Sequence, residues 1–366
     1  MSDPVVLHVV PAFFGGPDGI VGGAERYALE LARHMAEKVP TGLLTFGDRT
    51  RTETIGRLTV HVVGDPWYVR GQRTNPVSFE IVRAVRHAEI VHCHQQHVLG
   101  STVAAMTARL CRRRVFVSEL GGGGWDISAY VSTDRLYHGH LHLSEYSRQV
   151  YGHAAFPRAH VIYGGVDLAR FAPVAGTPRG CRIVYVGRIL PHKGVDRLIE
   201  TLPDGLELDV IGQAYDARYL DDLRALAADR PVRFRHDVTD EGLVEAYRTA
   251  LCVALPSRYT DRYGNVTRVP ELLGQTLLEG MACGTPALAT DVASLPEIVT
   301  DGSDGFVVDP DDVDLLRTRL TWLRDHPAEA DALGRTARAT VEQRFSWPTV
   351  VERCLAIYGL DGVHRG

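Results

Sequence analysis

The sequence predicts an α/β protein built from two Rossmann-like domains that face a central cleft. Apolar strand candidates alternate with helical patterns along 366 residues, and the alternation restarts after a loop rich in proline and glycine. Such alternation is typical of an open, doubly wound parallel sheet. The length corresponds to two domains of roughly 100–200 residues each. Ligands of these folds bind outside the carboxyl ends of the strands, so the site is expected at the cleft.

The first domain is expected to span residues 1–168. Its strand candidates are nearly continuous apolar runs, as in a parallel sheet that is covered on both faces. The expected strands are 5–10, 43–46, 58–63, 90–94 and 115–118, and the expected helices are 24–37, 79–88 and 103–110.

The second domain is expected to span residues 169–345. Residues 171–180 carry proline, glycine and alanine without a period and are interpreted as a linker. The expected strands are 182–186, 206–211, 232–235, 252–255 and 286–289, and the expected helices are 194–201, 217–228, 241–250 and 271–282.

Composition and charge exclude several classes of protein. The net charge of −5 provides no global basic field, so no nucleic-acid partner is expected. No apolar run reaches the roughly 18 residues that cross a bilayer, and the N-terminus lacks the basic region of a secretory signal. Six scattered cysteines form no CxxC pair, which argues against zinc and against disulfides. These features indicate a cytoplasmic protein.

Common catalytic motifs are missing from the sequence. It contains no Gly-x-Gly-x-x-Gly, no Gly-Lys dipeptide, no Gly-x-Ser-x-Gly and no His-Glu-x-x-His. The acidic residues of 309–312 offer either a divalent-ion site or a turn that caps a helix near residue 313, and the turn is favoured. Arg109, with the arginines of 112–114, forms either a weak contact for anionic lipid or a solvated helix end, and the helix end is favoured. No metal is expected.

Two cations follow the strand expected at 182–186. Arg188 and Lys193 lie in the loop Gly187-Arg188-Ile189-Leu190-Pro191-His192-Lys193-Gly194, at the carboxyl end of that strand. A guanidinium forks onto two phosphate oxygens and an ammonium adds a point charge, so the pair suits a diphosphate. The alternative is two solvated charges in front of a helix.

Two acids lie eight residues apart in the helix expected at 271–282. A continuous helix would separate Glu271 and Glu279 by about 12 Å along its axis and about 80° around it. Two carboxylates so placed can bind the diols at two ends of one extended ligand, and Gly274 lets backbone amides approach it closely. The alternative is a helix with one N-terminal acid and one exposed acid.

These residues resemble the retaining GT-B glycosyltransferases of family four. The resemblance covers most of the chain, including the loop Gly22-Gly23-Ala24-Glu25-Arg26 and the strand that ends in His92-Cys93-His94. Its specific part is the second domain, where the following residues match: Gly187-Arg188, Lys193-Gly194, Pro256-Ser257, Glu271, Glu279, Met281-Ala282-Cys283-Gly284-Thr285-Pro286, Leu295-Pro296-Glu297, 302–308 and Phe345-Ser346-Trp347.

The resemblance implies a nucleotide-diphospho-sugar donor, uridine-linked as in most of the family, and front-face substitution without a metal. It implies that Arg188 and Lys193 bind the diphosphate. It further implies that Glu271 contacts the donor sugar, and the catalytic candidates are therefore Arg188, Lys193 and Glu271. Further donor-binding candidates are Gly22, Gly23, Val238 at the base, Gly274, Thr276 and Glu279 at the ribose. The segment 346–366 is expected to return to the N-terminal domain as a helix.

The sequence departs from the family at the loop after the strand 115–118, where many relatives carry a histidine near the donor sugar. Glu119 and Asp126 are candidate replacements. The histidines His92, His94 and His97 offer either a metal site or an acceptor-side surface, and the acceptor side is favoured. The acceptor itself is not specified, and a natural product, a small thiol precursor and a lipid all fit. Two alternatives remain open: an NAD-type oxidoreductase and a nucleotide-sugar-binding protein without turnover.

Overall fold

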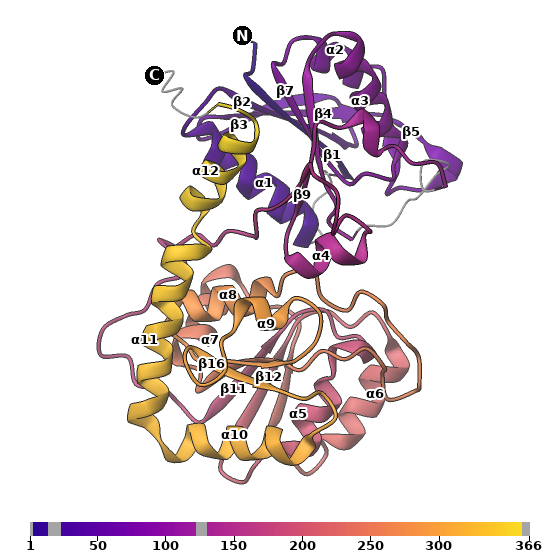
Figure 1. Cartoon of the computed structure of the whole chain (residues 1–366). Coiled ribbons are helices and arrows are strands. Elements are labelled where there is room, and N and C mark those ends of the chain that lie inside the picture. Colours follow the sequence, from indigo (N-terminus) through magenta and orange to yellow (C-terminus); the bar gives the residue numbers. More distant parts are fainter. Residues whose placement is uncertain (1–2, 14–22, 122–129, 361–366) are drawn as a thin grey trace. The chain divides into compact units, whose positions relative to one another are not determined.

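The computed structural model describes residues 3–13, 23–121 and 130–360, which form two compact units (Figure 1). Unit 1 holds residues 1–165 and 347–366, and unit 2 holds residues 166–346. The boundaries lie at 165/166 and 346/347, where the sequence suggested 168/169 and 345/346. Each unit is a largely parallel sheet covered by helices, so the predicted α/β class with two Rossmann-like domains is confirmed.

The described part of unit 1 contains an eight-stranded sheet of order β10-β9-β8-β7-β1-β2-β4-β3. Neighbouring strands are parallel except β3, which is antiparallel to β4. A short hairpin joins β5 (Trp67–Tyr68) to β6 (Pro76–Val77). The sheet strands are β1 (Val6–Phe13), β2 (Thr41–Gly47), β3 (Arg51–Ile55), β4 (Leu58–Gly64), β7 (Ile90–His94), β8 (Arg114–Ser118), β9 (Gly139–His142) and β10 (Ala159–Val161).

Helices cover both faces of this sheet. On one face α2 (Glu80–Arg86) and α3 (Leu99–Leu110) pack on alternate strand residues such as Leu7 and Val9. On the other face α1 (Gly23–Ala36) packs on residues such as Val10 and Leu43. The alternation follows from the two-residue period of a strand. The last helix, α12 (Trp347–Ile357), lies along α1, where the Trp347 ring is 5.6 Å from the Tyr27 ring. A short helix, α4 (Glu145–Val150), links β9 to β10.

Unit 2 contains a six-stranded parallel sheet of order β13-β12-β11-β14-β15-β16. Helix α8 packs on α7 and α11, and helix α5 packs on α6 and α10. The strands are β11 (Arg182–Val186), β12 (Glu207–Ile211), β13 (Val232–Arg235), β14 (Cys252–Leu255), β15 (Ala287–Thr290) and β16 (Gly305–Val308). The helices are α5 (Val195–Thr201), α6 (Ala217–Leu226), α7 (Asp240–Thr249), α8 (Gln275–Ala282), α9 (Leu295–Ile298), α10 (Val313–Asp325) and α11 (Pro327–Arg344).

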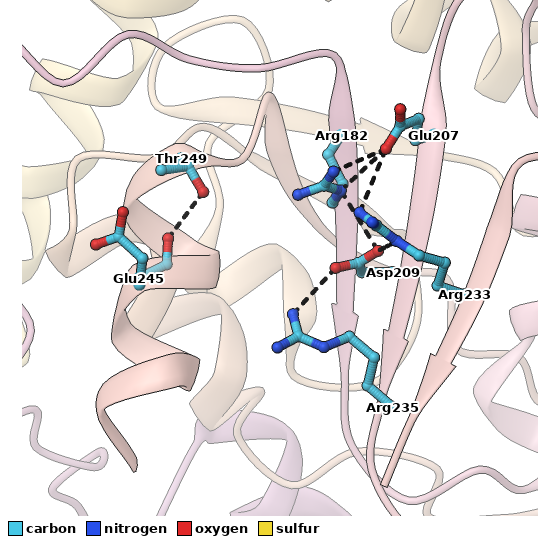
Figure 2. Close-up of polar contacts among 7 residues, drawn as sticks. All are labelled: Arg182, Glu207, Asp209, Arg233, Arg235, Glu245 and Thr249. Atoms are coloured by element: carbon cyan, nitrogen blue, oxygen red, sulfur yellow. Dashed lines mark hydrogen bonds and ion pairs between the residues drawn. The ribbon is translucent and has the colours of Figure 1, made fainter. Parts of the chain in front are cut away.

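An ion-pair network ties the edge strand β13 to its neighbours (Figure 2). Asp209 in β12 is 1% exposed, and its oxygens lie 2.9 Å from Arg233 Nε, 3.1 Å from an Arg235 nitrogen and 3.4 Å from Arg182 Nε. Glu207 pairs with Arg182 and Arg233 as well. The partners are cross-strand neighbours, because Arg182 is in register with Glu207 and Asp209 with Arg233. A buried carboxylate requires such partners, and here they fix the strand that leads into segment 236–239.

Candidate active site

The strand order of unit 2 defines a switch point between β11 and β14. The chain runs outward from β11 through β12 to β13, then returns to form β14 on the opposite side of β11. Loops that follow two such strands diverge to opposite faces, and ligands of open α/β sheets bind in the crevice that this creates. The loops after β11 and β14 carry the predicted cations and the first predicted acid.

Lys193 and Glu271 meet at this switch point. Lys193 is 8% exposed, and its Nζ donates hydrogen bonds to Glu271 Oε1 at 2.5 Å and to the Pro270 carbonyl at 3.0 Å. Ser257, just after β14, donates from Oγ to the same Glu271 oxygen at 2.7 Å. An ammonium has three N–H donors, and the two bonds that it makes to described residues leave one for a ligand. The structure therefore brings together a cation and an acid that lie 78 residues apart in the sequence.

The backbone around Lys193 depends on a close approach of the two loops. Lys193 ends a short 3₁₀ turn at Pro191–Lys193, and Gly194 follows with φ +69°. A Cβ on Gly194 would lie 2.0 Å from the Pro256 carbonyl oxygen, so only glycine fits. The Arg258 amide donates to the His192 carbonyl at 2.8 Å. The loop after β14 thus fixes the backbone that carries the ammonium.

Arg188 presents an uncommitted guanidinium at the same strand ends. The residue is exposed, and its carbonyl accepts a hydrogen bond from Tyr185 Oη at 2.7 Å. Among the residues that the structure describes, the guanidinium makes no hydrogen bond and no ion pair. Close contact between the loops positions this segment, because a Cβ on Gly212 would lie 2.0 Å from the Gly187 carbonyl oxygen. A planar fork with free donors can bind a phosphate oxygen pair.

The predicted start of the helix over 271–282 is wrong. Helix α8 begins at Gln275, and Glu271 lies in the irregular segment before it. Gly274 is left-handed with φ +88°, which interrupts any right-handed helix, and a Cβ there would lie 2.9 Å from Leu295 Cδ2. The 12 Å and 80° separation that a continuous helix would give the two acids therefore does not apply. The turn before the helix lets Glu271 face Lys193.

Glu279 lies on α8 and is 7% exposed. Its Oε2 accepts a hydrogen bond from Tyr247 Oη of α7 at 3.0 Å. Thr276, in the first turn of α8, is partly exposed, and so is Val238 after β13. The segment before Val238 is held by a hydrogen bond at 2.7 Å between His236 Nδ1 and the Gly212 carbonyl. The expected donor-binding residues of unit 2 thus lie in the segments that follow β11, β13 and β14 or in helix α8.

The polar segment after Ser257 folds back onto unit 2. Arg258, 8% exposed, pairs with Asp311 at 2.8 Å. Tyr263 hydrogen-bonds to Asp222 of α6, and the Arg218 guanidinium lies 4.4 Å from the Tyr263 ring centre. The turn expected at 309–312 is confirmed, because the Asp312 side chain accepts from the Leu315 amide at 2.8 Å and caps α10.

Glu119 is the most perturbed acid among the predicted residues of unit 1. It follows β8 and is 4% exposed, and burial raises its pKa to about 7. Backbone amides of Gln96 and Gly121 donate to its two oxygens at 3.1 and 3.2 Å and oppose that rise. Glu119 therefore exchanges a proton near neutral pH. Gly23 is the exposed first residue of α1, whereas Gly22 and Asp126 lie outside the described residues.

His94 does not lie where an acceptor surface was expected. His8, His92 and His94 are 0%, 0% and 1% exposed, and His94 Nε2 hydrogen-bonds to His8 Nδ1 at 2.8 Å. His92 bonds to Ser118 Oγ and to Tyr358 Oη. Burial lowers the pKa of all three rings. His92 and His94 are thus neutral core residues, and the expectation that they line the acceptor side is corrected.

Two contacts of the site were missed by sequence reasoning. Ser257 was expected only as part of a motif, although its place just after a strand signals a ligand-facing loop. Tyr247, which binds Glu279, sits in a helical pattern among apolar residues and gives no signal of its own.

None of the described helices is both long enough and apolar enough to span a bilayer.

Two Rossmann-like units, one of which carries cations and acids in the loops at a switch point, are typical of α/β proteins that bind nucleotides. The model of the family "Glycosyl transferases group 1" matches residues 179–340, and that of "Glycosyltransferase Family 4" matches residues 21–170. The chain belongs to this family of glycosyltransferases.

Relatives with known activities match along most of the chain. A GDP-mannose:cellobiosyl-diphosphopolyprenol alpha-mannosyltransferase of Xanthomonas oryzae is 24% identical over 96% of both chains. A D-inositol 3-phosphate glycosyltransferase of Catenulispora acidiphila is 27% identical over 94% of this chain and 91% of that protein. A GDP-mannose-dependent mannosyltransferase of Corynebacterium glutamicum that acts on an acylated phosphatidylinositol mannoside is 30% identical, over 58% of this chain and 59% of its own length.

Solved structures show the same fold. Anabaena HepE in complex with UDP and glucose has a TM-score of 0.72 and 17% identity, over 97% of this chain and 99% of that one. Sucrose-phosphate synthase from Thermosynechococcus elongatus has a TM-score of 0.70 and 17% identity, over 97% and 98% of the two chains.

Proposed function

We propose that this glycosyltransferase moves a sugar, with retention of anomeric configuration and without a metal, from a nucleoside-diphospho-sugar to an acceptor hydroxyl. The acceptor class is a small molecule, a natural product or a lipid. The observation that carries the proposal is the contact of Lys193 with Glu271 at the β11–β14 switch point. It places a nearly buried ammonium with one spare N–H beside a carboxylate, which is the arrangement needed at a phosphate–sugar junction.

Each group of the site has a distinct task in this proposal. Arg188 forks onto the diphosphate, and the third N–H of Lys193 binds a phosphate oxygen next to the scissile bond. Glu271, held by Lys193 and Ser257, accepts hydrogen bonds from hydroxyls of the donor sugar. Glu279 binds the ribose diol. The base lies against Val238, while Gly274 and Thr276 line the donor near the start of α8.

The transfer is a front-face substitution. The bond between the anomeric carbon and the diphosphate oxygen breaks, and the acceptor oxygen forms its bond to the same face of that carbon. The acceptor proton passes to the leaving phosphate oxygen, so the reaction balances without an added base. The developing negative charge on the diphosphate is stabilised by Arg188 and by Lys193, whose ammonium is held by Pro270 and Glu271 before the reaction.

Uridine is the expected donor base, and guanosine is the second candidate. The family resemblance favours uridine. Guanosine is favoured by two of the relatives above, whose names specify GDP-mannose. Thermal-shift measurements with UDP-glucose, UDP-N-acetylglucosamine and GDP-mannose decide between them, because a ligand at about 100 times its Kd stabilises the fold by about 2.7 kcal/mol.

Turnover is tested by the release of nucleotide from the donor that stabilises the protein. Release with an acceptor panel, lost in Lys193→Ala, supports the enzyme. A protein that binds donor but never releases nucleotide with any acceptor would instead be a nucleotide-sugar-binding protein. Lys38→Ala is the matched control, since lysine occurs only at positions 38 and 193 and Lys38 lies in unit 1.

A further inference from the structure

A second cluster of ligating side chains lies in unit 1, away from the histidines of the core. Asp134 begins the 3₁₀ turn Asp134–Leu136, His140 lies in β9, and His153 follows α4. One ligand atom of each residue lies within 4.8 Å of those of the other two. Three separate segments of chain therefore converge on one point.

A buried His140 nitrogen without a partner in the described part of the chain indicates a ligand at this point. The residue is 1% exposed, and its Nε2 has no hydrogen-bond partner among the described residues. The backbone of Asp134 lies beside the same ring. A buried nitrogen without a partner is costly and rare in native proteins. Ligating histidines around metals are commonly held in this way by a neighbouring carbonyl.

His153 and Asp134 are held in a comparable way. The Nε2 of His153 lies 3.6 Å from Asp134 Oδ1, and its Nδ1 is 3.0 Å from His142 Nε2. Asp134 Oδ1 accepts from Gln96 Nε2 at 2.6 Å, and Oδ2 accepts from Ser132 Oγ at 3.0 Å. Outer partners of this kind orient the ligands of metal sites.

Burial and access both suit a cation. His140 is 1% exposed, so an ion bound to its ring would be shielded from bulk water on that side. The Asp134 side chain is 30% exposed and His153 is 8% exposed, so a hydrated ion can reach the cluster from solvent. The core cluster lacks this access, because His8, His92 and His94 are at most 1% exposed, and both nitrogens of His92 already have partners.

We propose that Asp134, His140 and His153 bind one divalent transition-metal ion of the zinc type, with water completing a tetrahedral shell. Two imidazoles and one carboxylate are a donor set that zinc accepts readily. The ion cross-links the turn before β9, the strand itself and the segment after α4, and so stabilises this part of unit 1. The site takes no part in the transfer proposed for unit 2.

The test is metal binding by the full chain after chelator treatment and dialysis. Zinc is titrated and its bound stoichiometry measured by mass spectrometry, and cobalt(II) is added separately to record its visible absorption. We expect one zinc per chain, intense cobalt bands and a raised Tm for the wild type and for His160→Gln in neighbouring β10. We expect His140→Gln and Asp134→Asn to lose at least about tenfold in zinc affinity.

Asp134→Asn replaces a partly exposed side chain with one of the same shape, so its zinc affinity can be measured even if His140→Gln fails to fold. Circular dichroism confirms that each variant is folded before titration. A wild type that retains no stoichiometric zinc overturns the proposal. Equal zinc affinity in wild type and Asp134→Asn overturns it as well.

Discussion

Removal of the Lys193 ammonium tests the chemistry proposed for unit 2. Lys193→Ala deletes the two hydrogen bonds to Pro270 and Glu271 and the N–H that remains for a phosphate oxygen. Loss of one fixed donor to a developing charge costs about 10²–10³ in rate, or roughly 3–4 kcal/mol in transition-state free energy. The substitution also leaves Glu271, with a side chain 10% exposed, dependent on Ser257, which costs about 1–3 kcal/mol in folding free energy.

The assay is the initial rate of nucleotide release with saturating donor, read together with the urea midpoint of each variant. Lys193→Ala is expected to lower kcat by at least about 10² while remaining folded at the assay temperature. Lys38→Ala is expected to match the wild type in both measurements. A folded Lys193→Ala protein that keeps kcat within threefold of the wild type would refute the role given to this ammonium.

The remaining predictions concern stability. Asp209→Asn is expected to lower the unfolding free energy in urea by about 2 kcal/mol, because three arginines lose their buried counter-charge, and a loss below about 0.5 kcal/mol contradicts the network of Figure 2. Gly212→Ala is expected to lower the unfolding free energy by at least about 3 kcal/mol, since its Cβ would lie 2.0 Å from the Gly187 carbonyl oxygen. Gly205→Ala is the control, because Gly205 has φ +79° and open space around it, and it is expected to lower the unfolding free energy by about 1 kcal/mol. Equal losses in the two variants would refute the clash. Burial lowers the pKa of His8 to about 3, so below pH 6.5 the unfolded chain binds more protons than the folded one and the unfolding free energy falls as the pH falls. His8→Asn is expected to reduce the slope of unfolding free energy against pH by about 1.4 kcal/mol per pH unit between about pH 6 and 4. Equal slopes for wild type and variant, measured by urea titration at each pH, argue against a neutral buried ring.

Periodic apolar patterns were enough to predict most of the strands. Strands β7, β11, β13 and β14 coincide with their predicted ranges. β11 and β14 are short and mostly apolar, whereas β13 alternates apolar residues with arginine. Strand β9 was missed because Gly139–His142 alternates histidine with glycine and leucine, and its burial depends on contacts far away in the chain. Strand β3 was missed because its side chains are mostly exposed, so an apolar period is absent.

Motif spacing indicated the chemistry of the site but not its local geometry. The proximity of the cation loop to the first acid follows from strand order, since β11 and β14 are neighbours. The start of α8 could not be predicted, because Pro270 and Glu271 are typical of a helix N-terminus, and a glycine in the sequence does not specify the left-handed conformation that Gly274 adopts. The burial of His94 was equally inaccessible, because it is set by helices that pack on the sheet from distant parts of the sequence.

The proposed function requires that the Lys193 ammonium at the β11–β14 switch point binds the diphosphate of a nucleotide. Because lysine occurs only at positions 38 and 193, protein labelled with ¹³C-lysine gives two Cε signal sets in a proton–carbon correlation spectrum. We expect UDP or GDP, whichever stabilises the fold, to shift the Lys193 signal and to leave that of Lys38 unchanged, whereas the corresponding nucleoside should shift neither. A Lys193 signal that does not move at saturating nucleoside diphosphate would rule out a diphosphate contact for this ammonium.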